Sequence, residues 1–99
     1  MKVIITKRAQ NQLDRIEAWW HKKRDKAPTR FEDELEEAKR FLSSTPNLAR
    51  LHAARGKRVI RCTVMPKTRV KLYFWVDESA GVVNILSAWG GKRGREPKL

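Results

Sequence analysis

The spacing of apolar residues changes from a helical repeat to a strand repeat along this 99-residue chain. Over residues 9–20, and again over residues 31–42, apolar side chains recur at intervals of four, three and four. These intervals place each set on one face of an α-helix. Over residues 70–76 the interval becomes two, which is typical of a strand with one buried face. The sequence therefore predicts a pair of helices combined with a β-sheet.

Capping and breaking residues mark the ends of the two helices. Thr6 is a suitable cap for the first helix, which is expected to cover residues 7–24. Thr29, followed three residues later by Glu32, has the spacing of a capping box, in which each side chain satisfies the other's free backbone N–H. Pro46 stops the second helix, because a proline disfavours the helical conformation in the residue before it. Two amphipathic helices joined by a short turn are expected.

Four strands are expected around these helices. β-branched residues make residues 1–5 suitable for a short first strand. Residues 58–65 and 82–89 flank the alternating segment 70–76, and the connections are short enough for antiparallel hairpins. The expected fold is α+β with the order β-α-α-β-β-β, a helical hairpin packed on a small, mainly antiparallel sheet. It forms a single domain over residues 1–99, and the place of the first strand in the sheet stays open.

The strand pattern also predicts which residues are buried. Residues 47–56 show no clear period and are expected to form a connecting loop. Tyr73 and Trp75 share the strand face that points away from the helices, since side chains two residues apart lie on one face. The residues expected in the core between helices and sheet are Leu13, Ile16, Leu35, Leu42, Leu72 and Phe74.

The formal net charge of +12 is the strongest compositional signal. A surface with so much charge of one sign favours a polyanionic partner, either a nucleic acid or an acidic protein. No apolar run approaches the roughly 20 residues that cross a bilayer, and the N-terminus lacks a signal-peptide core. We therefore expect a cytoplasmic protein with no membrane partner. The single cysteine, Cys62, excludes an internal disulfide.

Basic and acidic residues are segregated along the chain. A stretch without Asp or Glu carries many cations and leads into Tyr73 and Trp75, a combination that suits an acidic or nucleic-acid surface, although such cations also keep sheet edges soluble. Acidic residues gather over residues 32–37, where a solvated helix face explains them. The cations of the basic stretch are Arg50, Arg55, Lys57, Arg58, Arg61, Lys67, Arg69 and Lys71.

Residue types that carry metal or nucleophile chemistry are sparse. His21 ends the first helix and His52 lies in the expected loop, and neither has the sequence spacing to ligands that a metal site shows. No serine has the context of a nucleophile. The sequence therefore predicts no metal site and no cofactor.

Several segments together carry a family resemblance over nearly the whole chain. They are Ile16-Glu17-Ala18-Trp19-Trp20, the loop around Pro46, Val59-Ile60-Arg61, residues 69–74, residues 83–89 and the terminal pattern Trp89-x-x-x-Arg93-Gly94-x-x-Pro97. In these segments and in element order the chain resembles the RelE/ParE toxin superfamily, particularly its ParE-like plasmid-stabilisation branch. The resemblance implies a toxin of a type II toxin-antitoxin system, neutralised by a cognate acidic antitoxin in a hetero-oligomer.

The resemblance implies one of two activities. ParE-like members poison DNA gyrase without nuclease chemistry, whereas RelE-like members cleave messenger RNA on the ribosome. The first activity predicts a surface that contacts the target or the antitoxin. The residues expected on it are Arg58, Arg61, Arg69, Tyr73, Trp75, Trp89, Lys92, Arg93 and Arg95.

The alternative endonuclease would use Lys57, Arg61 and Arg69 around the scissile phosphate. The tyrosine that RelE-like nucleases carry after the last strand has no counterpart, because Gly90 and Gly91 follow Trp89. Many ParE-like relatives have a histidine at the position of Gly90. The leading hypothesis is therefore a non-enzymatic toxin directed at gyrase. A non-toxic nucleic-acid-binding module is the third alternative.

Overall fold

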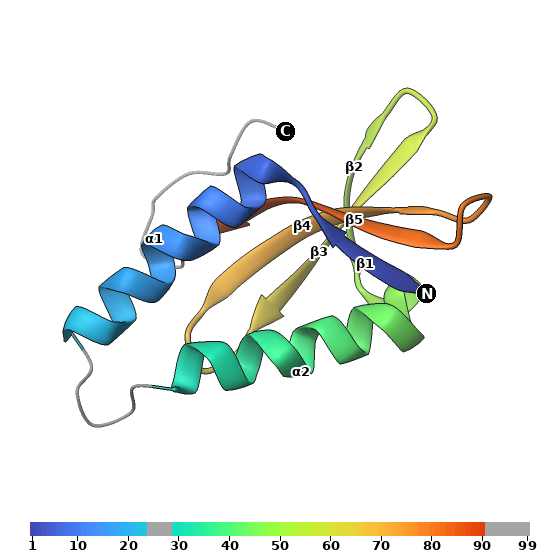
Figure 1. Cartoon of the computed structure of the whole chain (residues 1–99). Coiled ribbons are helices and arrows are strands. Elements are labelled where there is room, and N and C mark those ends of the chain that lie inside the picture. The colour runs from blue at the N-terminus through green and yellow to red at the C-terminus, as the bar shows by residue number, and fades with distance from the viewer. Residues whose placement is uncertain (24–28, 91–99) are drawn as a thin grey trace.

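The computed structural model describes residues 1–23 and 29–90, which fold as two helices and a five-stranded sheet (Figure 1). The strand order is β1-β5-β4-β3-β2, with β1 parallel to β5 and the other pairs antiparallel. This confirms the predicted α+β fold. The elements are β1 (Lys2–Ile5), α1 (Lys7–Lys23), α2 (Arg30–Ser44), the 3₁₀ turn η1 (Pro46–Leu48), β2 (Arg50–Arg55), β3 (Arg58–Met65), β4 (Val70–Asp77) and β5 (Val82–Trp89).

The prediction of a loop over residues 47–56 is wrong, because η1 and β2 occupy most of that segment. β2 is the last strand of the sheet order and is largely exposed, so neither of its faces imposes an apolar alternation on the sequence. Its pairing with β3 also shifts register between Leu51 and Ala53, which interrupts the period of two. An exposed, irregular edge strand leaves no clear pattern in a sequence.

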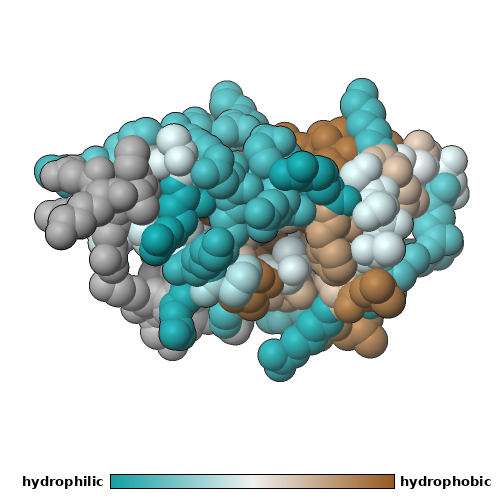
Figure 2. Space-filling model, turned by 90° about the horizontal axis from the view of Figure 1, so that it is seen from below, coloured by the Kyte–Doolittle hydropathy of each residue, from teal (hydrophilic) through white to brown (hydrophobic). Residues whose placement is uncertain are grey.

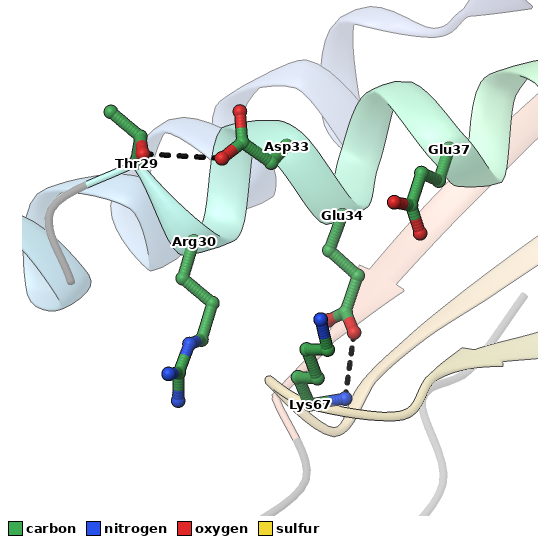
Figure 3. Close-up of a pocket in the computed structure, with 6 residues that line it drawn as sticks. All are labelled: Thr29, Arg30, Asp33, Glu34, Glu37 and Lys67. Atoms are coloured by element: carbon green, nitrogen blue, oxygen red, sulfur yellow. Dashed lines mark hydrogen bonds between the residues drawn. The ribbon is translucent and has the colours of Figure 1, made fainter.

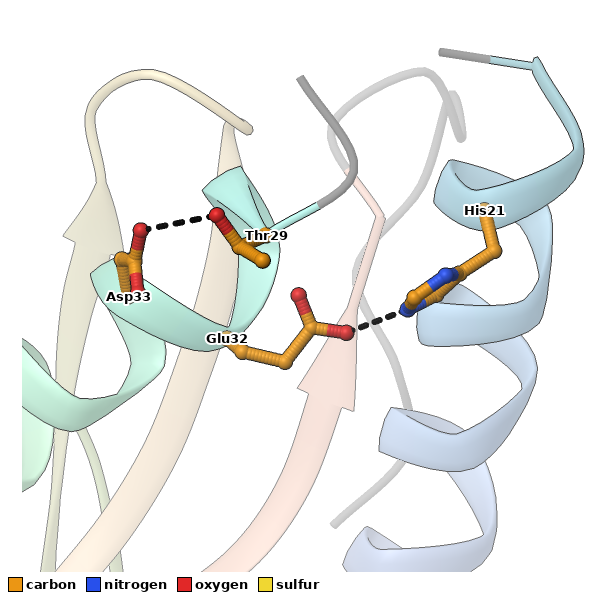
Figure 4. Close-up of polar contacts among 4 residues, drawn as sticks. All are labelled: His21, Thr29, Glu32 and Asp33. Atoms are coloured by element: carbon orange, nitrogen blue, oxygen red, sulfur yellow. Dashed lines mark hydrogen bonds and ion pairs between the residues drawn. The ribbon is translucent and has the colours of Figure 1, made fainter. Parts of the chain in front are cut away.

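The two helices begin differently from each other. At the start of α1, Thr6 Oγ1 accepts the backbone N–H of Ala9 at 3.2 Å, which confirms the predicted cap. The predicted capping box at α2 is not formed. The hydroxyl of Thr29 donates to Asp33 at 3.1 Å, and Glu32 turns toward His21 (Figure 4). Thr29 has φ −98° and ψ 2°, not the extended conformation from which a cap side chain reaches back to the helix.

The core lies between the helices and one face of the sheet. Of the six residues predicted there, Leu13, Leu42, Leu72 and Phe74 are buried, while Ile16 and Leu35 are half-buried and pack against them. Both helices therefore turn their apolar faces to the sheet, as their periodicity predicts. Figure 1 shows that the helices approach each other where α1 ends and α2 begins, and diverge from there.

The helix α1 protects the edge of β5 beyond the end of β1. The backbone N–H of Thr6 bonds to Ile85 O at 3.1 Å, where the parallel pairing with β1 stops. Further along β5, Gln12 Oε1 accepts the backbone N–H of Ala88 at 2.8 Å and the hydroxyl of Ser87 at 3.0 Å. A helix side chain thus satisfies strand groups that a neighbouring strand would otherwise bind.

Candidate functional site

The β2–β3 hairpin, residues 50–65, forms a basic surface at one edge of the sheet, and we call it the basic hairpin. It contains five arginine and lysine residues and no carboxylate. Four of them are exposed, and β2 has no strand on its outer side in the described part of the sheet. The hairpin therefore offers positive charge and unpaired strand groups at one edge. Its cations are Arg50, Arg55, Lys57, Arg58 and Arg61.

Positive charges are crowded at the tip of the basic hairpin. Arg55 and Arg58 are directly opposite each other in the strand register, with Gly56 and Lys57 forming the turn between them. Gly56 has φ +62°, a conformation that glycine adopts without steric cost. Like charges that face each other across a strand pair destabilise it. An anionic partner at this tip would remove the repulsion.

An aromatic side chain contacts one of these arginines. The guanidinium of Arg58 lies 4.5 Å from the ring centroid of Trp75, within the range of a cation–π interaction. Arg58 and Trp75, two of the predicted contact residues, therefore lie together on the sheet face opposite the helices. Tyr73 shares this face but is only 1% exposed, and the ring of His52 packs against it at 4.8 Å between centroids.

The remaining predicted contact residues are distributed over the sheet. Trp89 is half-buried at the end of β5, in register with Lys71 of β4. The predicted contact residues of the C-terminal segment lie outside the described residues. These are Lys92, Arg93 and Arg95.

The three cations of the nuclease hypothesis are not brought together. Lys57 lies in the turn before β3 and Arg69 in the turn after it, so the eight-residue strand separates them by about 25 Å at roughly 3.3 Å per residue. Arg61 lies between them, but its guanidinium donates to the backbone carbonyls of Asn47 at 3.2 Å and Ala49 at 2.9 Å. Arg61 thereby fixes η1 against β3.

Arg69 has a backbone conformation that is unusual for its residue type. Its φ is 61°, in the left-handed region, and its N–H bonds to Met65 O at 2.7 Å to close the β3–β4 turn. A side chain with a Cβ atom costs on the order of 1 kcal/mol in this conformation. Glycine would adopt the same turn freely, so Arg69→Gly removes the cation without disturbing the backbone.

Most of the acidic face of α2 is solvated, as the sequence predicts, but Glu34 is an exception. The side of the molecule that α2 crosses is largely hydrophilic, with hydrophobic patches toward one end (Figure 2). Glu34 is only 6% exposed. It accepts a hydrogen bond from the backbone N–H of Lys67 at 2.7 Å (Figure 3). It also accepts hydrogen bonds from the backbone N–H of Thr68 at 2.9 Å and from the Thr68 hydroxyl.

The helical period could have identified Glu34, because it lies three residues after the buried Phe31 and next to Leu35. Its carboxylate holds the β3–β4 turn against α2 at the edge of a shallow groove of about 220 Å³. The groove mixes acidic and basic groups. Its lining residues are Thr29, Arg30, Asp33, Glu34, Glu37 and Lys67.

Glu34→Ala should lower the free energy of unfolding by about 2–3 kcal/mol, because it leaves the buried donors of Thr68 without an acceptor. Urea denaturation followed by circular dichroism measures this change. Glu37→Ala, at an exposed position one turn away, is the matched control and should change stability by less than about 0.5 kcal/mol. Equal stability of the two variants would contradict the assigned role of Glu34.

His21 is exposed, as expected for a surface histidine, but two carboxylates lie beside it. Glu17 is on the same helix, and Glu32 reaches it from the first turn of α2 (Figure 4). His21 Nε2 lies 2.5 Å from Glu32 Oε1. This hydrogen bond is the main reason that the pKa of Glu32 lies below its ordinary value. Sequence spacing did not reveal the cluster, because Glu32 belongs to the other helix.

Comparison with known proteins agrees with this fold and with the sequence resemblance. The family model for the ParE toxin of the type II toxin-antitoxin system parDE matches residues 3–93. Comparisons with curated proteins and with solved structures gave no significant match. The match begins at the second residue of β1 and extends past β5, so it includes all the other helices and strands in full. The chain therefore belongs to the ParE toxin family of type II toxin-antitoxin systems.

Proposed function

We propose that this ParE-family toxin acts by binding DNA gyrase, without cutting RNA, and that it acts in the cytoplasm. The observation that carries the proposal is the separation of Lys57 from Arg69 by the length of β3. Cleavage of RNA needs cations that converge on one developing phosphorane, within hydrogen-bond distance of its oxygens. A toxin that blocks its target by binding needs only an extended complementary surface.

The family implies a cognate antitoxin, and the basic hairpin supports an acidic one. Exposed apolar side chains lie along the hairpin beside its cations: Val59, which is 47% exposed, follows Arg58 at the tip, and Leu51, which is 62% exposed, is opposite Arg61. An acidic segment with some apolar residues could pair with the free edge of β2, which would satisfy its backbone groups and bury these side chains. Toxin and antitoxin would then form a hetero-oligomer.

We propose no membrane partner for this chain. Across residues 1–23 and 29–90, neither helix combines the length and the apolar character that crossing a bilayer requires.

The decisive experiment compares two assays on the purified full-length chain. We expect inhibition in a gyrase supercoiling assay and no cleavage in a ribosome-programmed messenger RNA assay. The double variant Lys57→Ala/Arg69→Gly should melt as the parent does, because both positions are exposed and glycine fits the turn, so a change in its activity reports on the two cations. Ribosomal cleavage that falls by roughly 10²-fold or more in this variant would establish the endonuclease instead.

One further result of these assays would also overturn the proposal. If neither activity appears but the chain binds DNA or RNA, the non-toxic binding module is favoured. If the parent inhibits gyrase and the double variant melts like the parent but does not, the proposal stands and the turns around β3 belong to the gyrase-binding surface. Arg61→Ala is unsuitable for this test, because it removes the hydrogen bonds from Arg61 to the carbonyls of Asn47 and Ala49. A loss of activity in that variant could then result from lower stability of the fold.

A further inference from the structure

We propose that Glu17, His21 and Glu32 form a binding site for a divalent transition-metal ion, with zinc as the best match, which joins the end of α1 to the start of α2. Their possible ligand atoms all lie within 4.8 Å of one another. The site is separate from the basic hairpin, and it does not depend on the identity of the toxin's target.

The geometry of the two helices brings these ligands together. Glu17 and His21 are four residues apart in α1, so their side chains lie on the same face of that helix. Glu32 comes from the first turn of α2, where Figure 4 shows its carboxylate pointing toward His21. Ligand atoms of tetrahedral zinc, with bonds of about 2.0–2.1 Å, are roughly 3.4 Å apart. Rotation of surface side chains can close the remaining distance.

An unsatisfied atom in the cluster supports the presence of a cation. Glu32 Oε1 interacts with His21, whereas Glu32 Oε2 has almost no solvent-accessible surface and no hydrogen-bond partner among the residues described, although the side chain as a whole is 33% exposed. An acceptor atom that neither solvent nor a donor satisfies is costly, and more so when it is charged. The carboxylate of Glu17 adds a second negative charge nearby. A divalent ion would neutralise both carboxylates and provide Oε2 with a bond.

The donor set indicates which ion would bind. Mg²⁺ and Ca²⁺ prefer ligands that are all oxygen, whereas an imidazole nitrogen combined with carboxylates suits Zn²⁺. Three protein ligands leave a fourth tetrahedral position for water. The bound ion would link helices that otherwise contact each other mainly at this end, and it would therefore stabilise the folded state.

The test is a ZnCl₂ titration of the full-length, chelator-treated protein by isothermal calorimetry, together with thermal melting. We expect one ion per chain, and a rise in Tm on the order of 10 °C at about 100 times the Kd. Glu17→Gln, His21→Ala and Glu32→Gln should each weaken zinc binding by about 10-fold or more. The matched controls Glu36→Gln, at an exposed position one turn beyond Glu32, and His52→Ala should bind as the parent does.

Co²⁺ provides a second readout that does not depend on stability. The parent bound to Co²⁺ should show the visible absorption of tetrahedral coordination, and His21→Ala should lose it. The proposal is overturned if the parent binds no zinc, if the three variants bind it as tightly as the controls, or if MgCl₂ binds as tightly as ZnCl₂. Circular dichroism of each variant confirms that its helices are intact.

Discussion

Phe74→Ala should lower the free energy of unfolding by about 3–5 kcal/mol. Phe74 is fully buried on the helix-facing side of β4, opposite Arg61 of β3 and Ile85 of β5. Truncation removes most of a large side chain from a packed core and leaves a cavity that the sheet and helices cannot close. Small domains are stable by only about 5–15 kcal/mol, so much of the margin would be lost.

Urea denaturation followed by circular dichroism measures this effect. Val64→Ala is the matched control, because Val64 lies on the neighbouring strand β3, points to the opposite face of the sheet and is 51% exposed. It should cost less than about 1 kcal/mol. If both variants unfold at the same urea concentration as the parent, the core does not depend on this face of β4.

The parts of the fold that the sequence predicts are those with a regular period and one buried face. Helix α1 starts at Lys7, as predicted, and α2 starts at Arg30, directly after Thr29, where its start was expected. In both helices the apolar stripe and the flanking helix-breaking residues indicate the same start. β4 alternates clearly since its helix-facing residues Val70, Leu72 and Phe74 are buried and Val76 is half-buried. β1 has only four residues, and its parallel partner β5 follows it in the chain only after both helices and three other strands. No local pattern specifies that pairing.

The features that the sequence did not predict depend on how the elements dock. Glu34 became a buried acceptor only because the β3–β4 turn packs on α2. The contact between His21 and Glu32 requires the particular approach of α1 and α2. Likewise, Arg58 was identified as basic and Trp75 as aromatic, but their contact follows from the register of β3 and β4. Sequence reasoning found these residue types, and tertiary packing decided their roles.

Reversing the charge at the tip of the basic hairpin should slow association with the antitoxin by about 10-fold or more. Arg55 and Arg58 face each other there, so Arg55→Glu/Arg58→Glu converts the densest positive region of the hairpin into a negative one. Stopped-flow association with an acidic cognate antitoxin measures the rate. For the parent, the rate should fall as ionic strength rises from about 50 mM to about 500 mM, where the Debye length is well below 10 Å.

The matched control distinguishes the effect of charge on the hairpin from the effect of the protein's net charge. Arg15→Glu/Arg40→Glu removes the same amount of positive charge from exposed positions on α1 and α2. Its association rate should stay within about threefold of the parent's, because charges more than a Debye length from the contact are screened. Equal slowing of both double variants would mean that net charge, and not the hairpin, attracts the antitoxin. A hairpin variant that melts like the parent and associates at the parent's rate would show that the antitoxin approaches another surface.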